Sequence, residues 1–152
     1  MKLGLMTKDE CADFVEFNLT GNNEEYVKCH DESLYIDSNV FNLFAGCFEQ
    51  SNHLFEFIGQ TMYNARKIVP LLNALDKNLD RLTIIETVEE FKQYITGIFL
   101  GKDLLLDLYK ADPLWEQCWK FYLRRLIIVN RDLIALVNRC IEEERILWVI
   151  GY

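Results

Sequence analysis

Apolar residues along most of this chain recur at spacings of three and four, the period of one face of an α-helix. Asp37 or Ser38 is a suitable N-cap for one such helix, whose inward positions are Val40, Phe41, Phe44, Cys47 and Phe48. Asp112-Pro113 is a strong helix start, and the helical period continues from there for about 28 residues. The pattern therefore predicts a long C-terminal helix as the main element of the fold.

Two capping boxes predict two further helices. The first is Thr7-Lys8-Asp9-Glu10, and the helix that follows ends at Gly21 and carries on its apolar face Cys11, Phe14, Val15 and Leu19. The second is Thr87-Val88-Glu89-Glu90, and its helix directs toward the core Phe91, Tyr94, Ile95, Ile98 and Phe99. Gly97 and Gly101 weaken the end of that helix, so residues 102–110 are expected to form a separate turn or two.

The pattern in the middle of the chain leaves alternatives open. Residues 51–60 fit either a short helix or a buried connection that Gly59 closes. A helix is predicted from about Thr61 to Leu82, and Pro70 either kinks it or marks a restart. Short β-prone runs predict a hairpin over residues 25–36 and a buried C-terminal strand over residues 146–150, which pairs with the hairpin or else continues the helix.

These elements together predict a mainly α fold: a helical bundle of about five helices with a long C-terminal helix and a small antiparallel β element. The chain has 152 residues, 51% of them hydrophobic, and no linker rich in Pro, Gly or Ser interrupts it. This length is typical of one domain with a core of its own. We therefore expect a single globular domain over residues 1–152.

The cysteines and the N-terminus indicate a cytoplasmic protein. The N-terminal residues become charged too early to form the apolar segment of a signal peptide, and Lys102 and Asp103 interrupt the longest apolar stretch. The five cysteines are an odd number without a Cys-x-x-Cys pair, which is typical of reduced thiols buried as small apolar residues. No membrane association is expected.

The acidic residues are concentrated in the first part of the chain. The net charge is −8, and residues 1–65 hold eleven acidic and three basic residues, whereas charges cancel over residues 66–152. A field of one sign speeds encounter with a basic partner and repels nucleic acid, whose binding needs Lys and Arg. The alternative interpretation is an acidic surface that only maintains solubility.

Signals for catalysis are weak. His30 and His53 are the only histidines, and neither has the ligand spacing of a metal site. Cys47 and His53 could pair only if the intervening chain turned back, and Cys47 has the spacing of a core residue. The segment from Gly97 to Lys102 is one residue too short for a phosphate-binding loop. We therefore predict no catalytic residue, no metal and no cofactor.

The leading hypothesis is a non-enzymatic acidic module that binds a basic protein, in its most concrete form an inhibitor or immunity-type protein that neutralises a toxin or nuclease. Aromatic residues gather between Phe41 and Phe57, and aromatic anchors among carboxylates suit such an interface. The predicted partner-binding residues are Glu24, Glu25, Asp31, Glu32, Asp37, Glu49 and Glu56, with Phe55 or Phe57 as anchor. The alternatives are a homo-oligomeric scaffold domain and, ranked last, a small-ligand binder or enzyme without a sequence-visible motif.

Overall fold

The computed structural model describes residues 2–7 and 13–151, and within these ranges it contains four strands and five α-helices. The strands are β1 (Phe14–Asn18), β2 (Leu34–Asp37), β3 (Gly59–Tyr63) and β4 (Leu147–Gly151). The helices are α1 (Ser38–Ser51), α2 (Ala65–Thr83), α3 (Val88–Thr96), α4 (Gly101–Ala111) and α5 (Trp119–Glu142), with the 3-10 helix η2 (Trp115–Cys118) before α5. The protein is mainly helical, as predicted, but its sheet makes it a mixed α/β fold rather than an all-α bundle.

The strands form one antiparallel sheet in the order β2-β1-β4-β3. The C-terminal strand β4 lies inside the sheet, where Val149 is opposite both Phe17 of β1 and Thr61 of β3. The prediction of a strand at the C-terminus is confirmed. Its partners are β1 and β3, however, so chain segments from the start, the middle and the end of the sequence meet in one sheet.

Helix α1 packs on the inner face of the sheet through aromatic side chains. The ring centroid of Phe17 lies 6.0 Å from that of Phe41 and 5.9 Å from that of Phe48. Phe48 also contacts the Tyr63 ring at 5.7 Å, and the Tyr63 hydroxyl donates a hydrogen bond to the Phe48 carbonyl oxygen at 2.7 Å. This burial raises the pKa of Tyr63. Phe41 and Phe48, which the helical spacing placed on the inward face of α1, are therefore the residues that cover the sheet.

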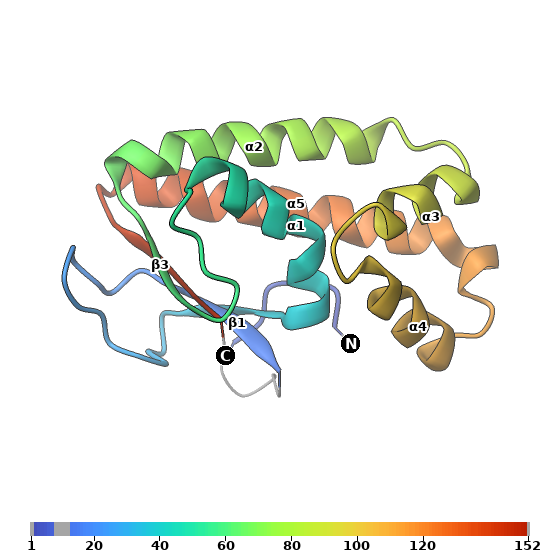
Figure 1. The fold of residues 1–152 in the computed structure, drawn as a ribbon, viewed down its shortest axis with the longest axis horizontal. Coiled ribbons are helices and arrows are strands. Elements are labelled where there is room, and N and C mark those ends of the chain that lie inside the picture. The colour runs from blue at the N-terminus through green and yellow to red at the C-terminus, as the bar shows by residue number, and fades with distance from the viewer. Residues whose placement is uncertain (1, 8–12, 152) are drawn as a thin grey trace.

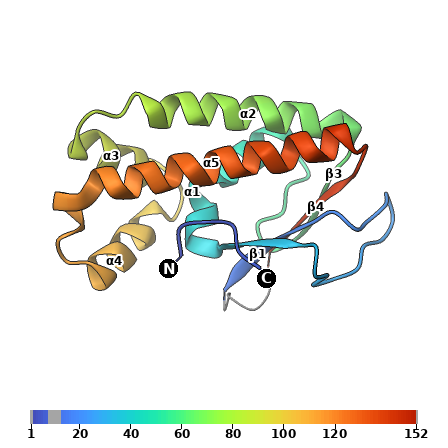
Figure 2. The same ribbon diagram turned by 180° about the vertical axis from the view of Figure 1, so that it is seen from behind.

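Helices α2 and α5 run side by side along the length of the molecule, with the sheet at one end and α3 and α4 at the other (Figures 1 and 2). A buried polar network joins them. Asn78 Nδ2 of α2 donates to Asn130 Oδ1 of α5 at 2.8 Å, and Asn130 Nδ2 donates to the Leu75 carbonyl oxygen at 2.9 Å. The Tyr94 hydroxyl of α3 donates to Asn78 Oδ1 at 3.1 Å. This network fixes the register of three helices.

The predicted N-terminal helix is wrong where the chain is described. Phe14–Asn18 is strand β1, in which Val15 and Phe17 point to the core and Glu16 and Asn18 to the opposite face. Val15, Glu16, Phe17 and Asn18 alternate as a strand requires, but Cys11, Phe14 and Val15 also have helical spacing after the capping box, so the local pattern fits both elements. The capping-box residues Lys8, Asp9 and Glu10, and Cys11 after them, lie outside the described residues.

Other boundaries also differ from the predictions. The second arm of the hairpin is confirmed as β2, but residues 25–29 form an irregular loop and β2 pairs with β1 instead. Residues 59–63 are strand β3, so the helix expected from Thr61 begins at Ala65 and continues through Pro70. Asp112 accepts a hydrogen bond from the Leu114 amide and precedes η2, so the long helix begins at Trp119.

The capping box at Thr87 is confirmed, with its reciprocal hydrogen bonds to Glu90 in place. Residues 101–111 form a regular helix, α4, where the two glycines predicted only a turn or two. A Cβ atom at Gly101 would overlap the carbonyl oxygen of Ile95, so glycine allows α4 to fold closely back against the end of α3. The glycines therefore mark a tight connection between two helices and not the loss of helical structure.

Replacing Asn130 should lower the free energy of unfolding more than replacing an exposed asparagine. In N130A, Asn78 Nδ2 would lose its acceptor and the Leu75 carbonyl oxygen would lose its side-chain donor, in a site from which water is excluded. We expect a loss of about 2–3 kcal/mol by urea denaturation. The control N73A, at an exposed position of α2, should change stability by less than about 0.5 kcal/mol. Equal losses in both variants would contradict this role.

Candidate functional site

The loop of residues 19–33 covers the outer face of the sheet, and one buried carboxylate holds it there. Glu16 is fully buried and accepts hydrogen bonds from Asn18 Nδ2 at 2.8 Å, from the Cys29 amide at 3.0 Å and from Ser33 Oγ at 2.8 Å. Burial, and then the negative charge of Glu16, raise the pKa of Tyr35 to about 12. A buried carboxylate requires such donors, and this loop supplies them.

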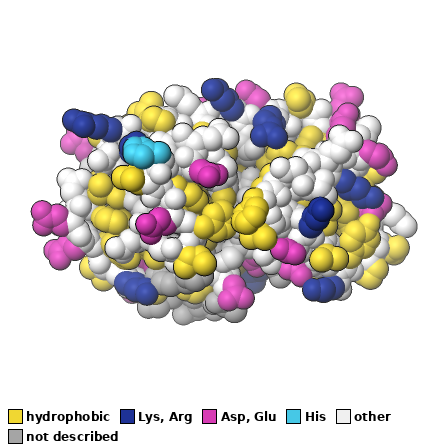
Figure 3. All heavy atoms as spheres, in the orientation of Figure 1, with side chains coloured by type: hydrophobic (Ala, Val, Ile, Leu, Met, Phe, Trp, Pro, Cys, Tyr) yellow, Lys and Arg dark blue, Asp and Glu magenta, His cyan; other side chains and the backbone are white. Residues whose placement is uncertain are grey.

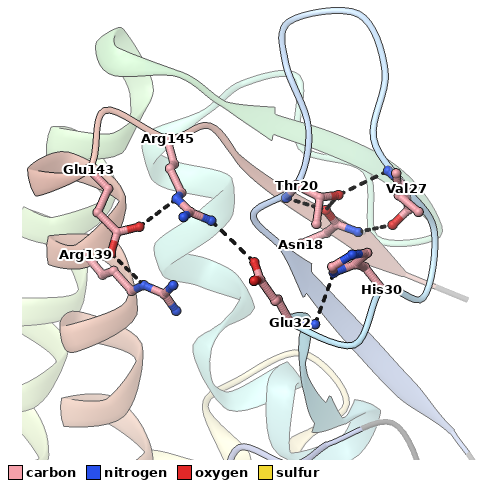
Figure 4. A network of polar contacts seen from close by, with 8 residues as sticks. All are labelled: Asn18, Thr20, Val27, His30, Glu32, Arg139, Glu143 and Arg145. Atoms are coloured by element: carbon pink, nitrogen blue, oxygen red, sulfur yellow. Dashed lines mark hydrogen bonds and ion pairs between the residues drawn. The ribbon is translucent and has the colours of Figure 1, made fainter.

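Asn18 organises the middle of the same loop. Its Oδ1 accepts from the amide and hydroxyl of Thr20 at 2.9 and 2.7 Å, and its Nδ2 also donates to the Val27 carbonyl at 2.7 Å. The Val27 amide donates back to Thr20 Oγ1 at 3.1 Å (Figure 4). Asn18 therefore joins the two arms of the loop, and their path is set by side chains rather than by strand pairing.

The tip of the loop is fixed to β4 and β3. Trp148 Nε1 donates to the Asn22 carbonyl at 3.0 Å, and the Tyr26 ring packs on Trp148 with centroids 5.0 Å apart. The Tyr26 hydroxyl donates to Gln60 Oε1 at 2.7 Å. A Cβ atom at Gly21 would lie 2.5 Å from Trp148 Nε1, so glycine is needed for this close approach. Gly21, predicted as a helix end, instead allows the indole to pack against the loop.

The sheet end of the molecule carries the excess negative charge. Residues 13–65, which supply β1, β2, β3, α1 and their loops, hold nine acidic residues and one basic residue. Residues 65–142, which supply helices α2–α5 and the connections between them, hold 12 basic and 11 acidic residues. The asymmetry seen along the sequence is therefore an asymmetry in space, with an acidic end and a neutral helical end.

Six of the seven predicted acidic contacts are exposed, and Asp37 is half-buried. Five of the exposed six have no ion pair among the described residues: Glu24, Glu25, Asp31, Glu49 and Glu56. The structure does not gather them at one point: Glu24 and Glu25 lie at the loop tip, Asp31 lies in the turn before β2, and Glu49 and Glu56 lie around the end of α1.

The other two acids have local partners. Asp37 Oδ1 accepts from the Asn39 and Val40 amides at 3.0 and 3.4 Å and is the N-cap of α1. Glu32 forms an ion pair with Arg145 at 3.6 Å, and Arg145 also pairs with Glu143 at 2.6 Å (Figure 4). Asp37 is thus committed to helix capping, while the exposed Glu32 pair can exchange for another cation at small cost.

The two predicted aromatic anchors differ in exposure. Phe55 is half-buried and packs on Phe41 and Phe48 at centroid distances of 6.2 Å each. Phe57 is 39% exposed and contacts Phe41 at 6.3 Å on one side and Phe99 at 6.1 Å on the other. Phe57 is therefore the one with a surface that a partner could cover.

Phe99 was predicted to face the core, and this is wrong: it is 74% exposed. It lies in the connection between α3 and α4, beyond the last helical turn of α3, so the helical period no longer governs its direction. The sequence Ile98-Phe99-Leu100 between Gly97 and Gly101 was the available signal for an apolar turn. In Figure 3, hydrophobic side chains gather at the centre of one face, over the loop before β3 and this connection.

A shallow pocket of about 510 Å³ lies beside the outer edge of β3, and its lining includes His53, Glu56, Gln60 and Trp148. His53 Nδ1 lies 3.4 Å from Lys67 Nζ, whereas the Cys47 thiol contacts the Ala74 carbonyl oxygen, so the two candidates for a nucleophilic pair have different partners. Burial raises the pKa of Cys47 to about 11. Among the described residues, no group of three or more His, Cys, Asp or Glu side chains could hold a metal ion.

Comparison with protein-family models, with curated proteins and with solved structures gave no match. In the described part of the chain, no helix has both the length and the apolar character to cross a membrane. Inference about function therefore depends on the surface of this molecule.

Replacing Glu16 with glutamine should release the loop of residues 19–33. The amide keeps one acceptor oxygen but turns an NH₂ group toward donors, so E16Q should lose about 2–3 kcal/mol of stability. Hydrogen exchange at the amides of residues 20–30 should accelerate more than exchange in α2 and α5. The exposed control E25Q should leave both measurements unchanged. Normal protection of the loop in E16Q would contradict the anchoring role.

The cysteines should differ widely in their reaction with iodoacetamide. Burial raises the pKa of Cys140 to about 12 and that of Cys47 to about 11, so at pH 8 about one in a thousand Cys47 thiols is ionised. The exposed Cys118 should be alkylated first, at least about a hundredfold faster, as measured by peptide mass spectrometry. A similar rate for Cys47 or Cys140 in the folded protein would contradict this order.

Proposed function

We propose that this protein is a non-enzymatic binding module that acts inside the cell and neutralises a basic protein partner, as an inhibitor or immunity-type protein neutralises a toxin or nuclease. The observation that carries the proposal is the acidic sheet end, where five exposed carboxylates form no ion pair with a described residue and Glu56 is next to the exposed Phe57 in the chain. Such carboxylates would occupy the surface that a basic enzyme uses for phosphates.

The rigidity of the acidic end supports the proposal. The loop that carries Glu24 and Glu25 is fixed by Glu16, Asn18 and Trp148, and the Asn22 side chain accepts from the amides of both glutamates at 2.7 and 3.0 Å. Carboxylates on a fixed backbone lose little conformational entropy when a partner binds. A surface kept only for solubility has no need of this fixed geometry.

The thiols support an intracellular site of action. Cys47, Cys118 and Cys140 form no disulfide bond, and Cys118 is exposed. Free thiols of this kind are typical of reducing compartments. These thiols are the reason why we propose an intracellular location in addition to a binding function.

The function can be tested by comparing two variants with the same net charge. One reverses four acids at the acidic end (E24K, E25K, E49K, E56K), and the control reverses four exposed acids on the helical end (D76K, D80K, E86K, E89K). Tagged proteins are used to capture partners from a lysate of the native host at low and high salt. We expect the wild type and the control variant to retain one basic protein stoichiometrically, with salt-sensitive binding, and the first variant to weaken it at least about tenfold.

The matched charge separates a local interface from a general electrostatic effect. Equal loss in both variants would show that only net charge matters, and unchanged binding in the first variant would refute the acidic end as the interface. If the wild type recovers only itself, self-association replaces the proposal. Circular dichroism and thermal unfolding of the four-fold variants establish that each one is folded.

A further inference from the structure

Two segments that meet at the Phe57–Phe99 contact expose five large apolar side chains, and we call these five the apolar ridge. Three come from the loop before β3 and two from the connection between α3 and α4: Leu54 (67% exposed), Phe57 (39%), Ile58 (83%), Phe99 (74%) and Leu100 (42%). The contact between the rings of Phe57 and Phe99 joins the two segments into one surface. Scattered apolar residues are normal on a surface, but a cluster that contains two phenylalanines marks an interaction site.

The backbone holds this ridge in place. Leu100 has φ +60°, a left-handed conformation that is costly for a bulky residue other than glycine. The close packing of Gly101 against the Ile95 carbonyl leaves the connection little freedom to relax. Phe57 is supported from below by Phe41 of α1. The fold therefore keeps Phe99 and Leu100 in solvent at a cost in backbone strain.

Among the described residues, carboxylates outnumber bases beside the apolar ridge. Glu49, Glu56 and Asp103 are exposed, lie close to the ridge residues in sequence, and form no ion pair with any described residue. The exposed Lys102 also follows Leu100 closely, so the rim is acidic on the side of Glu56 and mixed on the side of Leu100. Figure 3 shows Asp and Glu side chains to the left of the central hydrophobic cluster and at its lower right, with Lys or Arg side chains above it and on the right. An apolar centre with a mainly acidic rim is complementary to an apolar surface that carries basic residues.

A second exposed apolar surface has the opposite character. Phe121 is 60% exposed and lines a hollow of about 490 Å³ together with Tyr122, Lys2 and Arg125. Among the described residues that line this hollow, the charged ones are basic, which disfavours a basic partner there. The charge of the surrounding residues therefore distinguishes the two surfaces, and it favours the apolar ridge as the binding site for a basic partner.

We infer that the apolar ridge is the docking site for a basic amphipathic segment of the partner, whose apolar side chains cover Phe57 and Phe99 while its Lys or Arg side chains face Glu49, Glu56 and Asp103. This inference rests on the proposed function and adds to it the kind of segment that is recognised. Phe99 is the anchor, because a larger fraction of its side chain is exposed than of Phe57. The connection that carries Phe99 is also already ordered before a partner binds.

The probe is a fluorescein-labelled 14-residue peptide of leucine and lysine that forms an amphipathic helix, and a peptide with glutamate in place of each lysine is its counterpart. Binding to the full-length protein is measured by fluorescence anisotropy at low salt. We expect the basic peptide alone to bind. The ridge variant F99S/I58S should weaken it at least about tenfold, whereas the control F121S should change its Kd less than about twofold.

The outcomes separate this inference from the proposed function. If F99S/I58S binds normally while the four-fold acidic-end variant does not, the ridge is refuted and the acidic interface remains. If the wild type fails to bind the basic peptide, or if neither variant has an effect, both are refuted. Equal loss in F121S refutes a specific ridge. Sedimentation velocity shows whether the ridge mediates a dimer instead. If the double variant F99S/I58S is misfolded, the single variant L54S is used in its place.

Discussion

The burial of Glu16 is the constraint on which the acidic end of this protein depends. A carboxylate on the outer face of a sheet would ordinarily point into water, but here it is fully buried beneath residues 19–33. Leaving it without donors would be costly, so the loop must remain folded over it. The same loop covers Trp148 through Asn22 and Tyr26, and its His30 carbonyl oxygen accepts a hydrogen bond from the Tyr35 hydroxyl. One polar residue therefore orders an irregular segment and protects the sheet.

The helical end is specified by a different polar device. Asn78 and Asn130 satisfy each other between α2 and α5, and Tyr94 brings α3 to the same point. Apolar side chains supply most of the stabilisation there, but they permit many relative shifts of two long helices. A pair of amides that must meet selects one of these arrangements. Both ends of the molecule thus use buried hydrogen bonds to choose among packings that the core alone would allow.

The sheet end and the helical end have different roles in the proposed function. The helical end balances its charges and stiffens the molecule, while the sheet end holds nine acids against one base between residues 13 and 65. The apolar ridge lies where the two ends meet, because Phe57 belongs to one and Phe99 to the other. A partner bound there would contact carboxylates and aromatic rings together. The carboxylates would speed the association of a basic partner, and the apolar contact would slow its dissociation.

The sequence by itself determined the elements whose signals are local. The Asp37 cap with its aromatic helix, the Thr87 capping box and the long C-terminal helix follow from neighbouring residues and from a helical pattern. The apolar run at residues 146–150 indicated a strand but left a continued helix open, and pairing with β1 and β3 decides for the strand. The segregation of charge was also readable, because it is a property of composition.

Only the tertiary structure decided the rest. Phe14–Asn18 is a strand because β2 and β4 lie on either side of it and because a distant loop buries Glu16. Phe99 is exposed because Gly101 turns α4 back against α3, although its spacing matches the core face. In both places the environment of a residue comes from segments far away in the chain, and no local pattern encodes that environment.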